Sequence, residues 1–247
     1  MKNAAVIIAA LFIGVFIGYQ AADYQKSSQA SELIQEKIGD TSLTINPIIF
    51  NGHTAQKVAA LTFDDGPDPR FTPKILDILK KNKVKATFFD IGTSVQTYPE
   101  LARREARDGH EIGNHTWDHP ELELLTAAQI KSEISLGGKI IKRITGKTPR
   151  LFRPPHGIVT MPIFAIAEHT GYRLVMWSIS LRERHFKRPA SAGLWVAERV
   201  APGAIILAHD GRIDRARVVE ALPSLIRKLK NRGYRFVTVD QLPGSNF

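Results

Sequence analysis

The stretch VAALTF at residues 58–63 is followed by TPKILDIL at 72–79 and ATFFDI at 86–91, and this succession decides the fold. The first and third stretches are apolar runs of strand length. The middle one opens on a Thr-Pro pair and places Ile75, Leu76 and Leu79 on one face of a helix. A strand, a helix and a second strand in this order predict the βαβ unit of a parallel sheet.

The same alternation continues along the chain. Helices are predicted from Pro99 to Gly109 and from Thr126 to Gly146, where Thr126 and Gln129 form a capping-box pattern. About seven strands with intervening helices predict an α/β fold, a distorted or incomplete parallel (β/α) barrel with its active site at the carboxyl ends of the strands. The further strands are expected at 111–113, 151–153, 173–179, 204–209 and 235–239.

The start of the chain differs in composition from the rest. Lys2 is followed by a largely apolar run from Ala4 to Tyr19, so residues 1–22 are predicted to be a membrane signal-anchor, with a cleaved signal peptide as the alternative. Residues 23–56 are predicted to be a polar tether with a short helix around 32–38, and residues 57–247 a catalytic domain. We expect that domain outside the cytoplasm at the cell membrane, or secreted if the segment is cleaved.

Composition limits the chemistry that the chain can perform. The 247 residues include no cysteine, which excludes disulfides, Cys-ligated zinc and a cysteine nucleophile, so that any metal must be bound by His and carboxylates. The formal charge is +10, and residues 139–235 carry 20 Lys and Arg against 6 Asp and Glu. Such a surface suits nucleic acid, anionic lipid headgroups or an acidic envelope polymer, and charge alone does not choose among them.

Polar side chains of the kinds used in hydrolysis follow four of the predicted strands. Asp64 and Asp65 end the first strand, in the sequence TFDDGP, and a pair of histidines four residues apart, His115 and His119, follows another. One carboxylate and two imidazoles make the ligand set of a catalytic zinc site with an open position, and the second carboxylate is then free to act as a base. The other two strands end in Arg153, in RPPHG, and in His209, in AHDG.

Together these segments resemble the ordered motifs of the polysaccharide deacetylases, carbohydrate esterase family four, over about residues 57–242. The resemblance implies hydrolysis of N-acetyl groups on a polymer of the N-acetylglucosamine type, such as peptidoglycan, a chitin-like chain or an exopolysaccharide. It implies this polysaccharide as the partner, beside the membrane, and no nucleic acid. The implied cofactor is Zn²⁺ or another divalent transition metal.

The resemblance also implies a role for each residue of the site. Asp64 is the general base, Arg153 orients it, and His209 protonates the departing amine. The backbone amide of His156 stabilises the oxyanion, and Leu207 lines the pocket for the acetyl methyl. The implied metal ligands are Asp65, His115 and His119.

The segment WSISLRER, residues 177–184, departs from the family pattern, which ends in Asp-Trp. Glu183 is expected to replace the Asp and to raise the pKa of His209 as its partner. Arg184 stands where a Trp would wall the acetyl pocket, which predicts a changed substrate preference or a different conformation of this loop. Two other functions stay open, namely hydrolysis of a non-sugar C–N bond, which the export segment weighs against, and a non-catalytic envelope-binding module.

Overall fold

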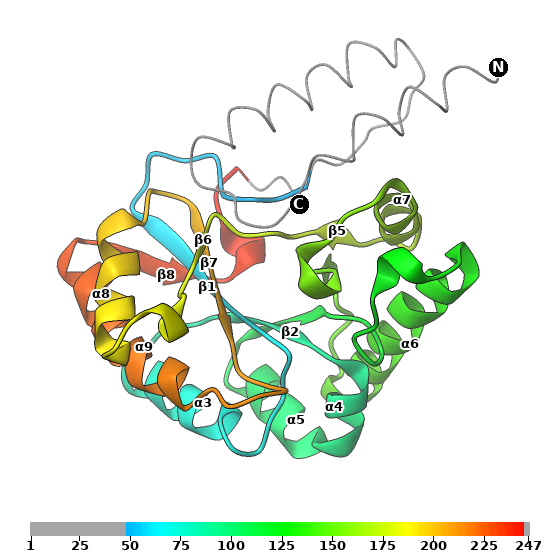
Figure 1. Ribbon diagram of the computed structural model, residues 1–247, viewed down its shortest axis with the longest axis horizontal. Helices are drawn as coiled ribbons and strands as arrows, with labels where there is room; N and C mark the ends of the chain where they lie inside the picture. The colour runs from blue at the N-terminus through cyan, green and yellow to red at the C-terminus, as the bar shows by residue number, and fades with distance from the viewer. Residues whose placement is uncertain (1–47, 245–247) are drawn as a thin grey trace, which may run out of the picture.

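A curled parallel sheet forms the centre of the computed structural model, which describes residues 48–244 (Figure 1). The strands follow the order β5-β4-β3-β2-β1-β7-β6, and β8 pairs with the first residues of β1. All of these pairings are parallel, so the strands begin at one end of the sheet and finish at the other. The bounds are β1 Val58–Asp64, β2 Thr87–Asp90, β3 Glu111–Asn114, β4 Leu151–Phe152, β5 Arg173–Leu174, β6 Ile179–Ser180, β7 Ala204–His209 and β8 Arg235–Val237.

The sheet curls into a distorted barrel because its two outermost strands are consecutive in the chain. Only residues 175–178 separate β5 from β6. The amide of Val175 donates to Phe152 of β4 at 2.9 Å, and that of Ser178 donates to Ile205 of β7 at 3.0 Å. This connection therefore joins the two sides of the ring.

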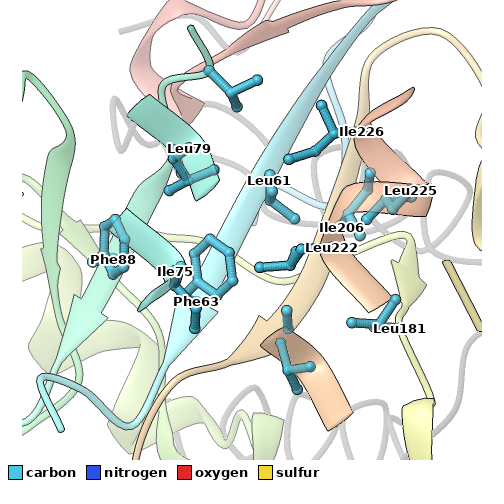
Figure 2. Close-up of a cluster of buried hydrophobic side chains, with 14 of the residues drawn as sticks. Leu61, Phe63, Ile75, Leu79, Phe88, Leu181, Ile206, Leu222, Leu225 and Ile226 are labelled. Atoms are coloured by element: carbon cyan, nitrogen blue, oxygen red, sulfur yellow. The ribbon is translucent and has the colours of Figure 1, made fainter. Parts of the chain in front are cut away.

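Helices surround the barrel (Figure 1), and they bury the outward-facing side chains of the strands. Leu61 and Phe63 of β1 point outward and pack against α3 and α9, as Figure 2 shows. Ala60 points the other way, into a second cluster inside the barrel, as alternation along a strand requires. The helices are α3 Thr72–Lys81, α4 Gly92–Thr97, α5 Pro99–Arg107, α6 Ala127–Thr145, α7 Met161–His169, α8 Pro189–Arg199 and α9 Ala216–Asn231, with short 3₁₀ helices η1 Leu122–Leu124, η2 Pro155–Gly157, η3 Glu183–His185 and η4 Val239–Gln241.

The predicted barrel is confirmed, with one difference in its strands. The capping box of Thr126 and Gln129 begins α6, and Gly146 ends it with a left-handed φ of 75°. The single strand expected at 173–179 is divided into β5 and β6, because its first part pairs with β4 and its last part with β7.

The packed part of the chain begins before the predicted start of the domain at Lys57. Ile49 is 5% exposed, and its amide donates to Leu174 at 2.9 Å. The apolar residues Ile48, Ile49 and Phe50 explain this boundary, because they are too hydrophobic to belong to a solvated tether. The predicted anchor at 1–22 and the short helix around 32–38 lie outside the described residues. Among residues 48–244, no helix is long and apolar enough to cross a membrane.

We predict that Leu61→Ala will lower the free energy of unfolding by about 2–5 kcal/mol, because it leaves a cavity between β1 and its covering helices. Urea denaturation of the purified protein measures this value. Leu124→Ala is the matched control, since Leu124 is 74% exposed and its truncation should change stability by less than about 0.5 kcal/mol. Equal losses for the two variants would contradict the placement of Leu61 in the core.

Candidate active site and metal centre

A cavity of about 320 Å³ opens at the carboxyl ends of the strands. The loops after β1, β3, β4 and β7 all contribute to it, because parallel strands deliver their following loops to the same end of the barrel. Seven of its lining residues belong to the site predicted from sequence, and five do not. The first group is Asp64, Asp65, His115, His119, His156, Leu207 and His209, and the second is Pro154, Gly157, Trp177, Arg212 and Arg215.

Three buried side chains in this cavity could hold a metal ion. One ligand atom from each of Asp65, His115 and His119 lies within 4.8 Å of the other two. Asp65 Oδ1 is 3.7 Å from His115 Nε2 and 3.3 Å from His119 Nε2. Two imidazoles and one carboxylate suit zinc and related divalent transition metals, so the donors present fit the predicted ion.

Both histidines are prepared as ligands by their surroundings. The Nδ1 of His115 is 2.6 Å from the carbonyl oxygen of Arg153, which requires the proton on Nδ1 and leaves Nε2 free to bind a cation. Burial lowers the pKa of His115 to about 4, although Asp65 opposes the shift. Burial and the neighbouring His115 lower the pKa of His119 to about 3. At neutral pH both rings are therefore uncharged, as metal ligation requires.

A turn in the backbone lets two adjacent carboxylates face one cavity. Consecutive residues of a strand point to opposite faces, so Asp64 and Asp65 would diverge if the strand continued. Asp65 instead has a φ of 77°, which turns its side chain toward the histidines. His119 and His156 also have left-handed φ values, of 63° and 59°. Each such residue costs about 1–3 kcal/mol, and such strain is concentrated at functional sites.

Asp64 lies beside the metal group and is held by a buried arginine. Its Oδ1 accepts a bond of 2.6 Å from Nη1 of Arg153, which is fully buried. The same guanidinium donates to Thr62 Oγ1 at 2.9 Å and to the carbonyl oxygens of Val175 at 3.1 Å and Met176 at 2.9 Å. Burial raises the pKa of Asp64 to about 6, although Arg153 opposes the shift. This position of Arg153 matches the orienting role predicted for it.

The remaining predicted residues of the cavity lie on its other walls. His209 ends β7 in register with Asp64, so the two side chains leave neighbouring strands at the same level. Burial, followed by the charge of Arg215, lowers the pKa of His209 well below its usual value. The ring of His156 lies 4.8 Å from the ring of His119, and its backbone amide makes no hydrogen bond within residues 48–244. Leu207 is buried in the apolar part of the wall.

The predicted pairing of Glu183 with His209 does not form. Arg182 has a φ of 48° and turns the chain into η3, so neither Glu183 nor Arg184 lines the cavity. Arg217 of α9 fixes this turn by donating to the carbonyl oxygen of Glu183 at 3.2 Å. In the described part of the chain, Glu183 pairs only with Arg184, at 4.0 Å. The placement of Arg184 as a wall of the acetyl pocket is corrected for the same reason.

Two arginines of the loop after β7 were missed by the sequence reasoning. Arg215 is buried and donates to Asp65 Oδ2 at 2.8 Å, which fixes the orientation of that carboxylate. The loop can approach Asp65 because Gly211 has no side chain, whereas a Cβ there would lie 2.0 Å from the carbonyl oxygen of Asp65. Nη1 of Arg212 contacts both ring nitrogens of His119 and lies 3.0 Å from Nε2. In the sequence, the only indication that these arginines belong to the site was their position, three residues apart, after the His-Asp-Gly at the end of a strand.

This combination of a metal-ligand group, a separate carboxylate base and a buried arginine, placed at the strand ends of a parallel barrel, defines the class of metal-dependent hydrolases. Residues 51–175 match the family model described as polysaccharide deacetylase. The chain belongs to the polysaccharide deacetylase family.

Named relatives agree with this assignment. Over 189 residues the chain is 41% identical to a peptidoglycan N-acetylglucosamine deacetylase of Bacillus cereus, covering 76% of this chain and 88% of the relative. Over 197 residues it is 38% identical to the peptidoglycan N-acetylmuramic acid deacetylase PdaA of Bacillus subtilis, covering 78% and 74%. The crystal structure of a peptidoglycan N-acetylglucosamine deacetylase with a bound N-hydroxybenzamide compound superposes with a TM-score of 0.76 at 36% identity, covering 79% and 92%.

We predict that Arg212→Gln will raise the affinity for Zn²⁺ about tenfold, because a like charge beside the ligand His119 is removed. Competition against a chromogenic chelator on the metal-stripped protein measures this affinity. Arg184→Gln removes an exposed arginine outside the cavity and should leave the affinity unchanged. Unchanged or weaker binding by Arg212→Gln would count against the position of this guanidinium at the metal centre.

Proposed function

We propose that the protein is a zinc-dependent deacetylase that removes N-acetyl groups from a polymer of the N-acetylglucosamine type, with peptidoglycan as the first candidate. The proposal rests on one observation, which is that two adjacent carboxylates have different surroundings and can therefore have different roles. Asp65 lies with His115 and His119 in the metal group, whereas Asp64 stays outside it on Arg153. The named relatives, which are peptidoglycan deacetylases, support the substrate class.

The residues around the metal group can perform amide hydrolysis. A divalent ion held by Asp65, His115 and His119 would polarise the acetamido carbonyl and lower the pKa of water. Asp64 accepts the proton of the attacking water at Oδ2, because its Oδ1 is engaged by Arg153. With a pKa of about 6, Asp64 is ionised at neutral pH and basic enough to accept a proton.

Residues on the opposite wall of the cavity can protonate the leaving nitrogen and stabilise the developing oxyanion. His209 passes a proton to the leaving nitrogen. Its lowered pKa keeps the ring neutral at neutral pH, so the ring first takes up the proton that Asp64 has removed from the attacking water. The free backbone amide of His156 donates to the carbonyl oxygen as charge develops on it. Leu207 and Trp177 provide apolar surface for the acetyl methyl.

Two alternative functions, a non-catalytic binding module and hydrolysis of a non-sugar C–N bond, have less support. A non-catalytic binding module does not need a carboxylate base beside a metal-ligand group, yet Asp64 and Asp65 both face the cavity. The relatives named above act on glycans rather than on other C–N bonds, which favours a sugar polymer. The apolar run from Ala4 to Tyr19 supports a location at the cell membrane with the domain outside the cytoplasm, or secretion if that run is cleaved.

We expect the purified, zinc-loaded protein to release acetate from peptidoglycan glycan strands. Removal of the metal with a chelator should abolish the release, and added Zn²⁺ should restore it. The reason is that polarisation of the carbonyl and activation of the water both depend on the ion. Chitin oligomers and acetylated exopolysaccharides, tested in parallel, define the substrate. If none of these polymers releases acetate, the proposed activity is refuted.

We predict that Asp64→Asn will lower kcat by about 10²–10⁴-fold while the zinc content stays unchanged, because the amide keeps its bond to Arg153 but cannot accept a proton. Acetate release and elemental analysis of the same preparation measure the two quantities. Asp65→Asn is the matched variant and should lower both. Loss of zinc from Asp64→Asn would show that Asp64 is a ligand rather than the base.

A further inference from the structure

The end of the barrel opposite the cavity carries a dense group of cations, which we call the basic pole. It consists of three connections that lead into strands, namely KKNKVKA at 80–86, KRITGKTPR at 142–150 and RKLKNRGYR at 227–235. None of the three contains an Asp or a Glu. They lead into β2, β4 and β8, which begin at the end of the sheet away from the active site.

Contacts between these connections show that they form one surface. Lys230 donates to the carbonyl oxygen of Asn82, which joins two of them. Lys147 donates to the carbonyl oxygen of His110 at 3.3 Å, and Lys85 donates to that of Asp108, so the third connection lies beside the first. Burial and the charge of Lys85 lower the pKa of the intervening His110 to about 4, in keeping with a positive field here.

The charges of the basic pole are not neutralised by the described part of the chain. No lysine or arginine of the three connections forms an ion pair within residues 48–244, and the contacts described above use neutral carbonyl oxygens. The nearby Asp108 pairs with Arg104 at 3.5 Å, and Glu111 faces Thr87 and the amide of Asp240. The surface therefore presents a net positive charge to whatever it meets.

Helix dipoles explain only part of this charge. Lys80, Lys81 and Lys142 lie in last helical turns, where cations complement the negative end of the dipole. Lys83 and Arg150 lie beyond the ends of their helices and gain nothing from that interaction. The remaining charge is available to an external partner, and that partner is not the acetamido group in the cavity at the far end of the barrel.

The chain before β1 also reaches the domain at this end. The amide of Gly52 donates to Gly203, just before β7 begins, at 2.8 Å. Lys57 donates to the carbonyl oxygen of Arg232, within the basic pole, at 3.1 Å. Lys57, the residue before β1, therefore adjoins the basic pole, and the apolar run from Ala4 to Tyr19 precedes it in the sequence.

We propose that the basic pole rests on an anionic lipid bilayer, so that the active site opens away from the membrane. Phosphate headgroups form a broad layer of negative charge, which matches cations spread over three connections of one barrel end. A polybasic surface beside an apolar segment is a two-part attachment, in which each part strengthens the other. This inference goes beyond the proposed deacetylation, because it concerns orientation and would hold for any substrate.

The absence of cysteine from the sequence allows a direct test on the full-length protein. A fluorophore is attached at Thr148→Cys in the basic pole, or at Glu123→Cys in η1 on the catalytic side, and the protein is placed in nanodiscs that contain nitroxide-labelled lipid. With phosphatidylglycerol in the disc, quenching at position 148 should exceed that at position 123 about threefold. The difference should shrink in zwitterionic discs. It should also shrink in 0.5 M salt, because the Debye length there is only about 4 Å and the attraction to the headgroups is screened.

Charge removal provides the matched comparison. Combined Lys81→Gln, Lys142→Gln, Arg143→Gln and Arg150→Gln should reduce quenching at position 148 to the level at position 123. Combined Arg182→Gln, Arg184→Gln, Lys187→Gln and Arg188→Gln removes the same charge from an exposed loop elsewhere and should leave it unchanged. The thermal unfolding midpoint and acetate release confirm that the first variant is folded.

Three results would overturn the proposal. The first is equal quenching at the two positions in anionic discs, and the second is quenching at position 148 that ignores lipid charge and salt. The third is a basic-pole variant that keeps its quenching but loses binding to polyglycerol phosphate in solution, which would assign the surface to an anionic wall polymer. The deacetylase proposal survives each of these results, since acetate release from a soluble glycan does not depend on orientation.

Discussion

The guanidinium of Arg153 connects the parts of the barrel that the site requires. It is fully buried, it lies 4.1 Å from the ring centre of Phe89, and it donates to side chains of β1 and to carbonyl oxygens of the segment between β5 and β6. A buried cation is tolerated only when its donors are matched, and here Asp64 supplies the countercharge. Asp64, the proposed base, is thereby held in place by the interaction that also joins two sides of the ring. The neighbouring carbonyl oxygen of Arg153 fixes the tautomer of His115, so the metal group depends on the same residue.

Much of this arrangement could be predicted from the sequence, because the barrel brings the strand ends together. Once the βαβ alternation is recognised, Asp64, His115 and His209 must meet at one end of the sheet, and the structure places them there. The predicted pairing of Glu183 with His209 failed because the chain after β6 turns into η3, which keeps Glu183 out of the cavity. The left-handed turn at Arg182 and the anchoring of η3 by Arg217 depend on tertiary contacts that no local pattern indicates.

Arg212 and Arg215 are residues of the site that the sequence did not reveal. Within a strongly basic half of the chain, two more arginines carry little information, and only the close approach of Gly211 to Asp65 brings this loop to the metal group. The two arginines act on different ligand residues. Arg215 fixes the orientation of Asp65, whereas Arg212 places a positive charge against His119. The cations of the basic pole are equally plain in the sequence, but their common location follows only from parallel strands that all begin at one end.

We propose that Asp65, His115 and His119 bind one metal ion while Asp64 remains free to act as the base. Anomalous X-ray diffraction at the zinc edge, from crystals of the zinc-loaded protein, tests this claim most directly. We expect one strong peak at about 2.0–2.2 Å from a carboxylate oxygen of Asp65 and a ring nitrogen of each histidine, with Asp64 still bonded to Arg153. A peak at another group of residues, or one with Asp64 among its ligands, would contradict it.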